Sequence, residues 1–262
     1  AIDAPRFVVT PGFIDLHVHW PQGHVRGRFA GQLLPWLRES IWPAEAGISD
    51  AIEAATRAHA FANDLVRAGT TTAMTFGPPF LSATLQAGLS RFAYDGPALM
   101  EVNAPEYMCR PAAEVLAEIA ALSDAMVTTR GFRRSDVVIS PRFAPNMTVE
   151  GLQACGDFAR KHGLLVQSHV SENLDEVQWV RDLFPDATDY TDVYDRAGLL
   201  GPRTVLAHGI HLSDRELRRI AATQTVIAHC PTSNEALSSG RMPLRRYRDF
   251  GVRWVLATDV GA

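Results

Sequence analysis

Short apolar runs alternate along the chain with stretches in which apolar residues recur every three to four positions. The short runs are typical of buried strands, and the longer stretches are typical of amphipathic helices. We predict strands over Phe7–His19, Thr70–Phe76, Ala98–Val102, Asp136–Ile139, Leu164–Ser168, Thr204–Ala207, Thr225–Ala228 and Val252–Thr258. We predict helices over Ser49–Arg67, Arg110–Thr129, Thr148–His162, Leu174–Phe184, Ser213–Thr223 and Pro243–Phe250. Strands that alternate with helices in this way predict a parallel sheet.

Several predicted helices carry end signals in the sequence. Candidate N-caps that precede an acidic residue are Ser49, Thr148 and Ser213. Glycines stand between a helix and the next strand at Gly69, Gly163 and Gly251, where a helix C-terminus is expected. These signals support the alternation of helices and strands.

Eight strand candidates in 262 residues match an α/β fold of the (β/α)8 TIM barrel type, which typically has about 250 residues. A doubly wound open sheet is the alternative, but it usually carries a glycine-rich loop after its first strand. That position here holds Leu16-His17-Val18-His19. Polar residues follow or end most of the predicted strands: His19, Asn103, Arg142, His169, His208, His229 and Asp259. Because catalytic groups of TIM barrels lie at the C-terminal ends of the strands, these residues predict one converging site.

Composition narrows the function classes. Hydrophobic residues make up 47% and charged residues 21%, and the formal net charge is −4 without a long block of one sign. We therefore expect a globular protein that binds neither nucleic acid nor a membrane. The three cysteines, Cys109, Cys155 and Cys230, lie far apart, and the first residues lack a signal-peptide pattern. We expect a reducing, cytoplasmic location.

Two histidines one residue apart indicate a metal site. Period-two alternation on a strand places the imidazoles of His17 and His19 on the same face. His169 and Asp259 are the further candidate ligands, and a set of three histidines and one carboxylate suits Zn2+ or, alternatively, Fe2+. These ligands leave a coordination position for water, whose pKa the metal lowers towards ~7.

Two further side chains are candidates for the chemistry around such a metal. Glu172, three residues after His169, can transfer protons between the water and a ring nitrogen, although alone it reads as a helix-start carboxylate. His208 can stabilise developing charge on the attacking oxygen or be a ligand itself. His229 is a candidate for packing or for support of the ligands. Lys161, the only lysine, lies in a predicted helix, which argues against a metal pair bridged by a carboxylated lysine.

The segment Pro11-Gly12-Phe13-Ile14-Asp15-Leu16-His17-Val18-His19 resembles the opening motif of the amidohydrolase superfamily. His169, His208 and Thr258-Asp259 follow in that superfamily's order. Within it, the chain resembles the guanine deaminase family. The segments that carry this likeness are His19-Trp20-Pro21-Gln22, Leu33-Leu34-Pro35-Trp36-Leu37, Trp42-Pro43-Ala44-Glu45, Ser140-Pro141-Arg142-Phe143, Ser168-His169-Val170-Ser171-Glu172-Asn173 and His229-Cys230-Pro231-Thr232-Ser233-Asn234.

The resemblance implies one Zn2+ held by His17, His19, His169 and Asp259, with His208 near the water and Glu172 as proton shuttle. It implies purine contacts from Gln22, Arg142 and Phe143, hydrolytic deamination of guanine to xanthine and ammonia, and a homodimer. The chemistry agrees, since an arginine fork matches the O6/N7 edge of guanine, a glutamine amide both donates and accepts, and a phenylalanine can cover a ring face.

Two other functions stay open at this point. One is a related aminohydrolase or chlorohydrolase that acts on another purine, a pterin or a triazine; the other is a metal-free binding protein built on a barrel. We expect residues 1–262 to form one catalytic barrel domain, as a fragment of a longer chain. The resemblance implies a further helix and a small β-sandwich that this stretch of sequence lacks.

Overall fold

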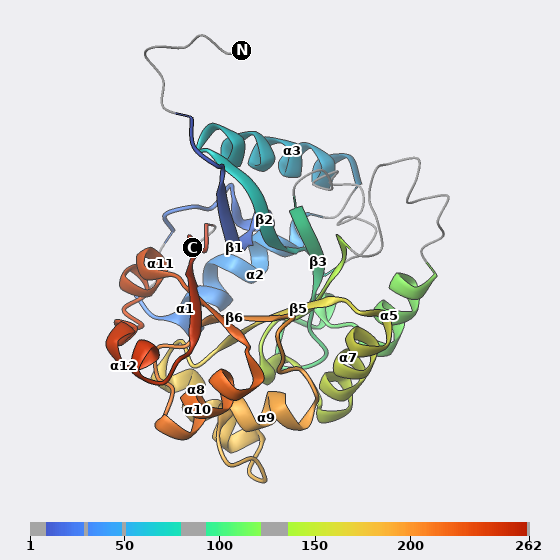
Figure 1. Cartoon of the computed structure of the whole chain (residues 1–262). Helices are drawn as coiled ribbons and strands as arrows, with labels where there is room; N and C mark the ends of the chain where they lie inside the picture. Colours follow the sequence, from blue (N-terminus) through green and yellow to red (C-terminus); the bar gives the residue numbers. More distant parts are fainter. Residues whose placement is uncertain (1–8, 29–30, 49–50, 80–92, 122–135, 261–262) are drawn as a thin grey trace.

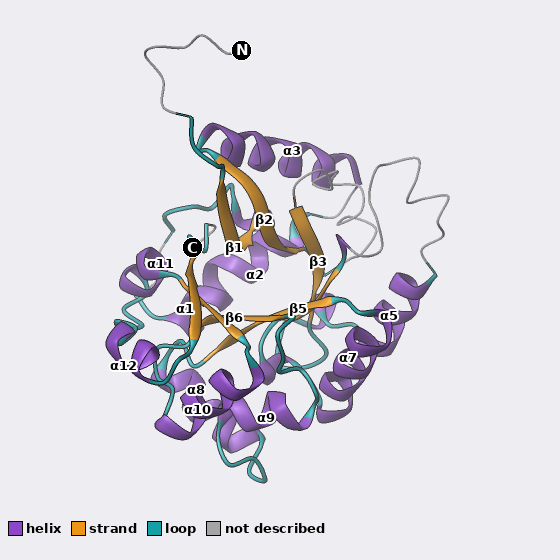
Figure 2. Ribbon diagram, in the orientation of Figure 1, coloured by secondary structure: helices purple, strands orange, loops and turns teal. Residues whose placement is uncertain are grey.

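The computed structural model describes residues 9–28, 31–48, 51–79, 93–121 and 136–260. Eight parallel strands pair in sequence order from β1 to β8 and curve into a barrel with helices around it (Figures 1 and 2). The strands are β1 (Phe13–His19), β2 (Thr70–Gly77), β3 (Ala93–Leu99), β4 (Val138–Pro141), β5 (Leu165–Val170), β6 (Thr204–His208), β7 (Val226–His229) and β8 (Arg253–Leu256). The predicted (β/α)8 fold is confirmed.

The barrel closes just beyond β8. The Asp259 amide donates to the His17 carbonyl at 2.9 Å, and the His19 amide donates to the Val260 carbonyl at 3.1 Å. These two backbone hydrogen bonds join the segment after the last strand to the first strand. They set Asp259 directly beside the His17/His19 pair.

Helices connect the strands on the outside of the barrel (Figure 2). Between β1 and β2 lie η1 (Trp20–Gln22), α1 (Leu33–Trp36), the π-helical turn η2 (Leu37–Ile41), α2 (Trp42–Ala46) and α3 (Ala51–Arg67). The later connections hold η4 (Glu106–Met108), α5 (Ala112–Ala120), η6 (Ala144–Asn146), α7 (Val149–His162), α8 (Leu174–Leu183), α9 (Tyr190–Arg196), α10 (Asp214–Thr223), α11 (Pro231–Ala236) and α12 (Leu244–Asp249). Sequence periodicity missed α1, η2, α2, α9 and α11, which have four to seven residues each.

The end signals of two predicted helices are confirmed. Thr148 accepts from the Gly151 amide at 2.9 Å, and Ser213 forms a reciprocal capping box with Glu216. Gly163 ends α7 in the left-handed conformation, which glycine adopts without a steric penalty. The candidate cap Ser49 and the predicted helical residues 122–129 lie outside the described residues.

Several strand boundaries differ from the prediction. The strand predicted at Ala98–Val102 is β3, which runs from Ala93 to Leu99. Its centre, Asp95-Gly96-Pro97, reads as a turn, but Asp95 is buried and accepts from Thr75 Oγ1 and Trp20 Nε1. The structure therefore satisfies this carboxyl inside the barrel. Strand β4 similarly begins and ends two residues later than predicted.

Apolar contacts hold the helices against the barrel wall. The largest buried cluster includes Ile139, Val166 and Leu206 from the strands and Leu152 and Tyr194 from the helices. No helix in the described ranges combines the length and apolar character needed to cross a bilayer. The barrel wall thus positions the polar strand ends that form the site described next.

Candidate active site

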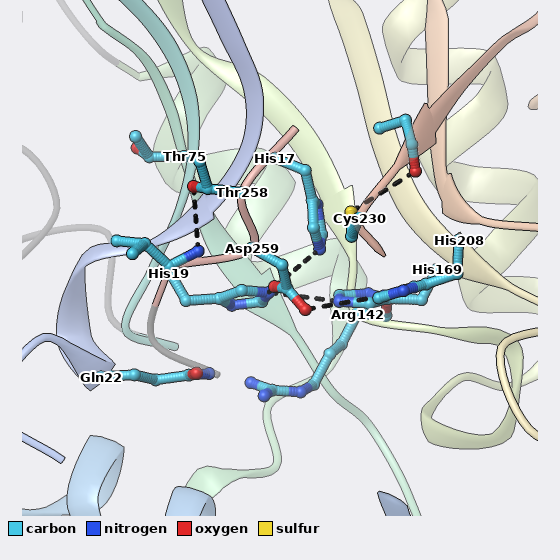
Figure 3. A network of polar contacts seen from close by, with 12 residues as sticks. His17, His19, Gln22, Thr75, Arg142, His169, His208, Cys230, Thr258 and Asp259 are labelled. Carbon is cyan, nitrogen blue, oxygen red and sulfur yellow. Dashed lines mark hydrogen bonds and ion pairs between the residues drawn. The ribbon is translucent and has the colours of Figure 1, made fainter. Parts of the chain in front are cut away.

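Three histidines converge at the C-terminal ends of β1 and β5 (Figure 3). The HxH alternation places His17 and His19 on the same inward face of β1, where both are buried. The Nε2 atoms of His19 and His169 lie 3.2 Å apart, and one ring nitrogen from each of the three residues falls within a 4.8 Å group. The structure thus brings together the three imidazoles that the sequence analysis proposed as ligands.

Asp259 completes the cluster. Its Oδ1 lies 3.2 Å from His17 Nε2 and 3.4 Å from His19 Nε2. Asp15, to which the sequence reading gave no role, accepts from Thr258 Oγ1 at 2.5 Å and from the Thr258 amide at 3.2 Å. Because these partners are 243 residues apart in the chain, only the closed barrel brings them together.

The donor set fits a metal ion. Adjacent ligand atoms around a tetrahedral Zn2+ lie about 3.3 Å apart, which matches the separations in this cluster. His169 Nδ1 lies 2.6 Å from the Arg142 carbonyl, so Nδ1 carries the proton and Nε2 keeps its lone pair. Burial, reinforced by the charge of neighbouring His17, holds the pKa of His19 and of His169 well below the ordinary value. Both rings are therefore neutral and available as ligands.

The pKa of Asp259 also favours a ligand role. Burial opposes ionisation, but His17 and His208 together hold the Asp259 pKa below its ordinary value. Asp259 is thus an ionised carboxylate inside the protein, which requires a cationic or hydrogen-bonding partner. Neutral imidazoles beside an ionised carboxylate are a donor set suited to Zn2+ or Fe2+.

A cysteine also stands near this cluster. Cys230 groups with His17 and His208 within 4.8 Å, although the sequence reading treated it only as an isolated cysteine. Burial raises the Cys230 pKa well above the ordinary value, and its thiol donates to the Ala228 carbonyl at 3.4 Å. Cys230 is therefore a neutral thiol with a hydrogen bond of its own, which makes it a weaker ligand than Asp259.

Glu172 and His208 face each other beside the cluster. Glu172 Oε2 lies 3.4 Å from His208 Nε2, and Glu172 Oε1 accepts from Ser239 Oγ at 3.0 Å. Burial raises the pKa of Glu172 to about 7, despite the nearby His208. Burial alone would lower the pKa of His208, but Glu172 and Asp259 raise it above the ordinary value. A carboxyl that titrates near neutral pH is suited to giving and taking protons.

Backbone and side-chain partners hold Glu172 and His208 in place. The Glu172 amide donates to Glu176 Oε2 at 2.8 Å, and His208 Nδ1 lies 2.8 Å from Asn234 Oδ1. Positive φ angles occur at Ser171 (47°), His208 (70°) and Asp259 (53°). Residues other than glycine rarely adopt this conformation, and such strain tends to cluster at functional sites. The capping-box spacing of Asn173 and Glu176 was a sequence signal for Glu176, whereas no spacing rule points to Asn234.

The candidate substrate contacts lie on the other side of the pocket. Gln22, Arg142 and Phe143 line one cavity with His19, His169, Glu172, His208 and Asp259. The empty space of this cavity, including its part open to solvent, is about 400 Å³. Figure 3 shows the ends of Gln22 and Arg142 pointing toward each other.

Glu45 stands between these two side chains and was missed in the sequence. It accepts from Gln22 Nε2 at 2.7 Å and from an Arg142 terminal nitrogen at 2.6 Å. Gln22 therefore uses one N–H of its amide on Glu45, which leaves its second N–H and its Oε1 for a ligand. The segment Trp42-Pro43-Ala44-Glu45 was the available signal, but no spacing rule links it to Arg142.

Three other residues from the sequence reading lie outside the cavity. Asn103 and His229 do not line it: the Asn103 amide donates to the Pro145 carbonyl at 2.8 Å, and the His229 ring contacts Trp254 edge-on. The prediction that all seven strand-end residues converge is therefore wrong for these two. Lys161 is exposed on α7, so a carboxylated lysine at the site is excluded.

A barrel with three histidines and one aspartate at the C-terminal ends of its strands is typical of metal-dependent hydrolases. The chain belongs to the amidohydrolase family, which it matches over residues 8–262. It is similar to a probable guanine deaminase of Deinococcus radiodurans, with 40% identity over 97% of this chain and 58% of that protein. Guanine deaminase of Escherichia coli is 34% identical over 97% of this chain and 59% of that protein.

A solved structure shows the same likeness. Guanine deaminase from C. acetobutylicum, with guanine bound in its active site, superimposes with a TM-score of 0.87. The identity is 34% over 96% of this chain and 61% of that chain. The chain spans about three fifths of the length of these relatives. The resemblance drawn from the sequence motifs is thus confirmed.

Proposed function

We propose that this protein catalyses the hydrolytic deamination of guanine to xanthine and ammonia. The main support for this proposal is one cavity. It is lined by candidate metal ligands, by Glu172, whose pKa is about 7, and by Gln22 and Arg142, which can bind a purine. The similarity to guanine deaminases supports the choice of guanine. A cytoplasmic location, inferred from the scattered cysteines, and a homodimer, implied by the resemblance, remain predictions.

The proposed metal ligands are His17, His19, His169 and Asp259, and the proposed ion is Zn2+, with Fe2+ as the alternative. When bound, such an ion lowers the pKa of a water ligand towards ~7 and so supplies a nucleophile at neutral pH. The low pKa values of His19 and His169 keep their lone pairs free for this role at neutral pH.

Proton transfer is assigned to Glu172. It takes a proton from the attacking water and gives it to N3 of guanine as the C2–O bond forms. Glu172 then takes the remaining proton from the hydroxyl group on C2 and gives it to the 2-amino group, so that the C2=O bond forms as the C2–N bond breaks and ammonia leaves. His208, whose pKa Glu172 and Asp259 raise above its ordinary value, hydrogen-bonds through its Nε2 the oxygen on which negative charge develops.

Substrate orientation is assigned to the opposite wall. Arg142 donates to O6 or N7 of guanine, and Phe143 covers a ring face. Gln22 Oε1, which is buried without a hydrogen-bond partner among the described residues, accepts from a ring N–H.

The test is ammonia release from a panel of purines, pterins and triazines, with the metal content measured on the same sample. We expect the fastest turnover with guanine, about one metal ion per chain, and loss of activity on chelation that Zn2+ restores. Faster release from another heterocycle would replace guanine as the substrate. A protein without metal, whose properties chelation leaves unchanged, would favour the metal-free binding protein instead.

A further inference from the structure

Glu45 is a buried carboxylate that contacts both candidate substrate-binding side chains. It lies on α2 with 1% of its surface exposed. Its Oε1 accepts from Gln22 Nε2 at 2.7 Å, and its Oε2 accepts from Arg142 at 2.6 Å. Each carboxylate oxygen thus holds one side chain, and the two side chains come from different parts of the barrel.

An ionised carboxylate accepts hydrogen bonds and cannot donate them. Glu45 therefore selects one of the two amide orientations of Gln22, with the NH2 group toward Glu45 and Oε1 away from it. Gln22 Oε1 is buried and has no partner among the described residues, although Gln22 lines the cavity. A buried acceptor without a partner is costly unless a ligand satisfies it.

Arg142 is held in the same way. Glu45 uses one terminal N–H of its guanidinium, and the other N–H groups have no hydrogen-bond partner among the described residues. The guanidinium keeps its charge and its remaining donors available in the cavity that it lines. The wall opposite the histidine cluster therefore presents one acceptor beside fixed donors.

We propose that Glu45 is a positioning residue that sets substrate specificity by fixing Gln22 as an acceptor and Arg142 as a donor. This inference rests on the proposed function. An acceptor on Gln22 beside donors on Arg142 complements a lactam edge, in which a ring N–H stands next to a carbonyl, as N1–H and O6 do in guanine. The same two side chains do not match the edge of 2,6-diaminopurine, where a ring nitrogen acceptor stands next to an amino group. This compound carries the same 2-amino leaving group as guanine.

The test compares kcat/KM for guanine and 2,6-diaminopurine in the complete gene product loaded with Zn2+. Glu45→Gln can donate as well as accept, so it lets the Gln22 amide turn and present its NH2 group. We expect kcat/KM for guanine divided by kcat/KM for 2,6-diaminopurine to fall about tenfold. A change of this size corresponds to the loss of one hydrogen bond to the substrate. A general loss of packing would lower both values together and leave the ratio unchanged.

Glu216→Gln is the matched control, because Glu216 is another buried, hydrogen-bonded glutamate but caps α10 away from the cavity. Its ratio should equal that of the unmodified protein. Glu45→Asp keeps an acceptor-only carboxylate on a shorter side chain, so we expect a higher KM for guanine, nearly unchanged kcat and a retained ratio.

The outcomes separate the two levels of inference. If the unmodified protein releases no ammonia from guanine, the proposed function fails, and the role of Glu45 fails with it. If guanine is deaminated but Glu45→Gln leaves the ratio unchanged, the positioning role alone is wrong. Should Glu45→Gln not fold, the result for Glu45→Asp decides: a raised KM with a retained ratio supports the role, and an unchanged KM overturns it.

Discussion

Replacing Glu172 with glutamine should separate the chemistry of this site from its stability. The substitution keeps the size of the side chain and keeps an oxygen to accept from Ser239 Oγ, which lies 3.0 Å from Glu172 Oε1. It removes the group that exchanges protons. Loss of a positioned acid–base group typically lowers turnover 10²–10⁴-fold, or raises the barrier by about 2.7–5.4 kcal/mol.

The same substitution should stabilise the metal-depleted protein at alkaline pH. Burial raises the Glu172 pKa from its ordinary 4.5 to about 7, so the fold favours the neutral acid. The contribution of this group to stability is therefore complete below pH 4.5 and is lost as the pH rises to 7. Above that, the ionised carboxylate opposes folding by about 3 kcal/mol, which glutamine relieves.

Two assays check these expectations on one preparation. Ammonia release gives kcat with Zn2+ present, and denaturant unfolding of chelator-treated protein gives the free energy of unfolding at pH 4.5 and pH 8. Glu172→Gln should match the unmodified protein at pH 4.5 and exceed it at pH 8. Glu150→Gln, which changes an exposed carboxylate in the first turn of α7, is the control: it should leave kcat unchanged and lower the free energy of unfolding by at most about 1 kcal/mol, the size of a helix-dipole effect.

Either result can refute the reasoning. Undiminished turnover in Glu172→Gln would remove Glu172 from proton transfer. A stability difference that does not grow between pH 4.5 and pH 8 would show that burial does not raise the Glu172 pKa. Titrating groups distant from Glu172 contribute equally in both proteins and cancel in the difference, whereas His208, whose pKa Glu172 raises, contributes to it together with Glu172.

Three further substitutions test the groups around the cavity. Arg142→Ala should raise KM for guanine at least about tenfold, because it removes charged donors; steady-state kinetics with an unchanged KM would exclude the contact. Asp15→Asn should weaken metal retention about 10–100-fold, because Asp15 ties Thr258, and so Asp259, to β1; competition with a chelator measures this, and unaltered retention would count against it. Tyr194→Phe should lower the free energy of unfolding by about 1–3 kcal/mol, because it leaves the buried Ala144 amide without its acceptor at 2.9 Å; denaturant unfolding with no change would contradict this.

Local patterns in the sequence were enough to predict the barrel and the histidine cluster. The period-two spacing of His17 and His19 carries its own geometry, since any strand places the two side chains on one face. Strand–helix alternation likewise predicts the order of the parallel strands. Where the prediction failed, as in the Asp95-Gly96-Pro97 centre of β3, tertiary hydrogen bonds satisfied residues that resemble a turn in isolation.

The supporting residues could not be predicted because their partners are distant in the chain. Glu45 meets Arg142 across 97 residues, and Asp15 meets Thr258 across 243. No spacing rule connects such pairs, and a carboxylate in a short helix or in the middle of a strand carries no local sign of its partner. Only the closed barrel, in which β1 meets the segment after β8, brings these groups together.

These distant partners divide the cavity into two independently supported halves. On one side, Asp15 holds the Thr258-Asp259 segment against β1. On the other, Glu45 holds Gln22 and Arg142. Since Asp15 and Glu45 share no hydrogen-bond partner among the described residues, a change at Asp15 should act on metal retention and turnover, and a change at Glu45 on KM and substrate choice. Substitutions at two sites without shared partners usually have additive free-energy effects. Combining Asp15→Asn with Glu45→Asp should therefore give the sum of the separate effects, whereas strong non-additivity would mean that the two halves of the cavity move as one unit.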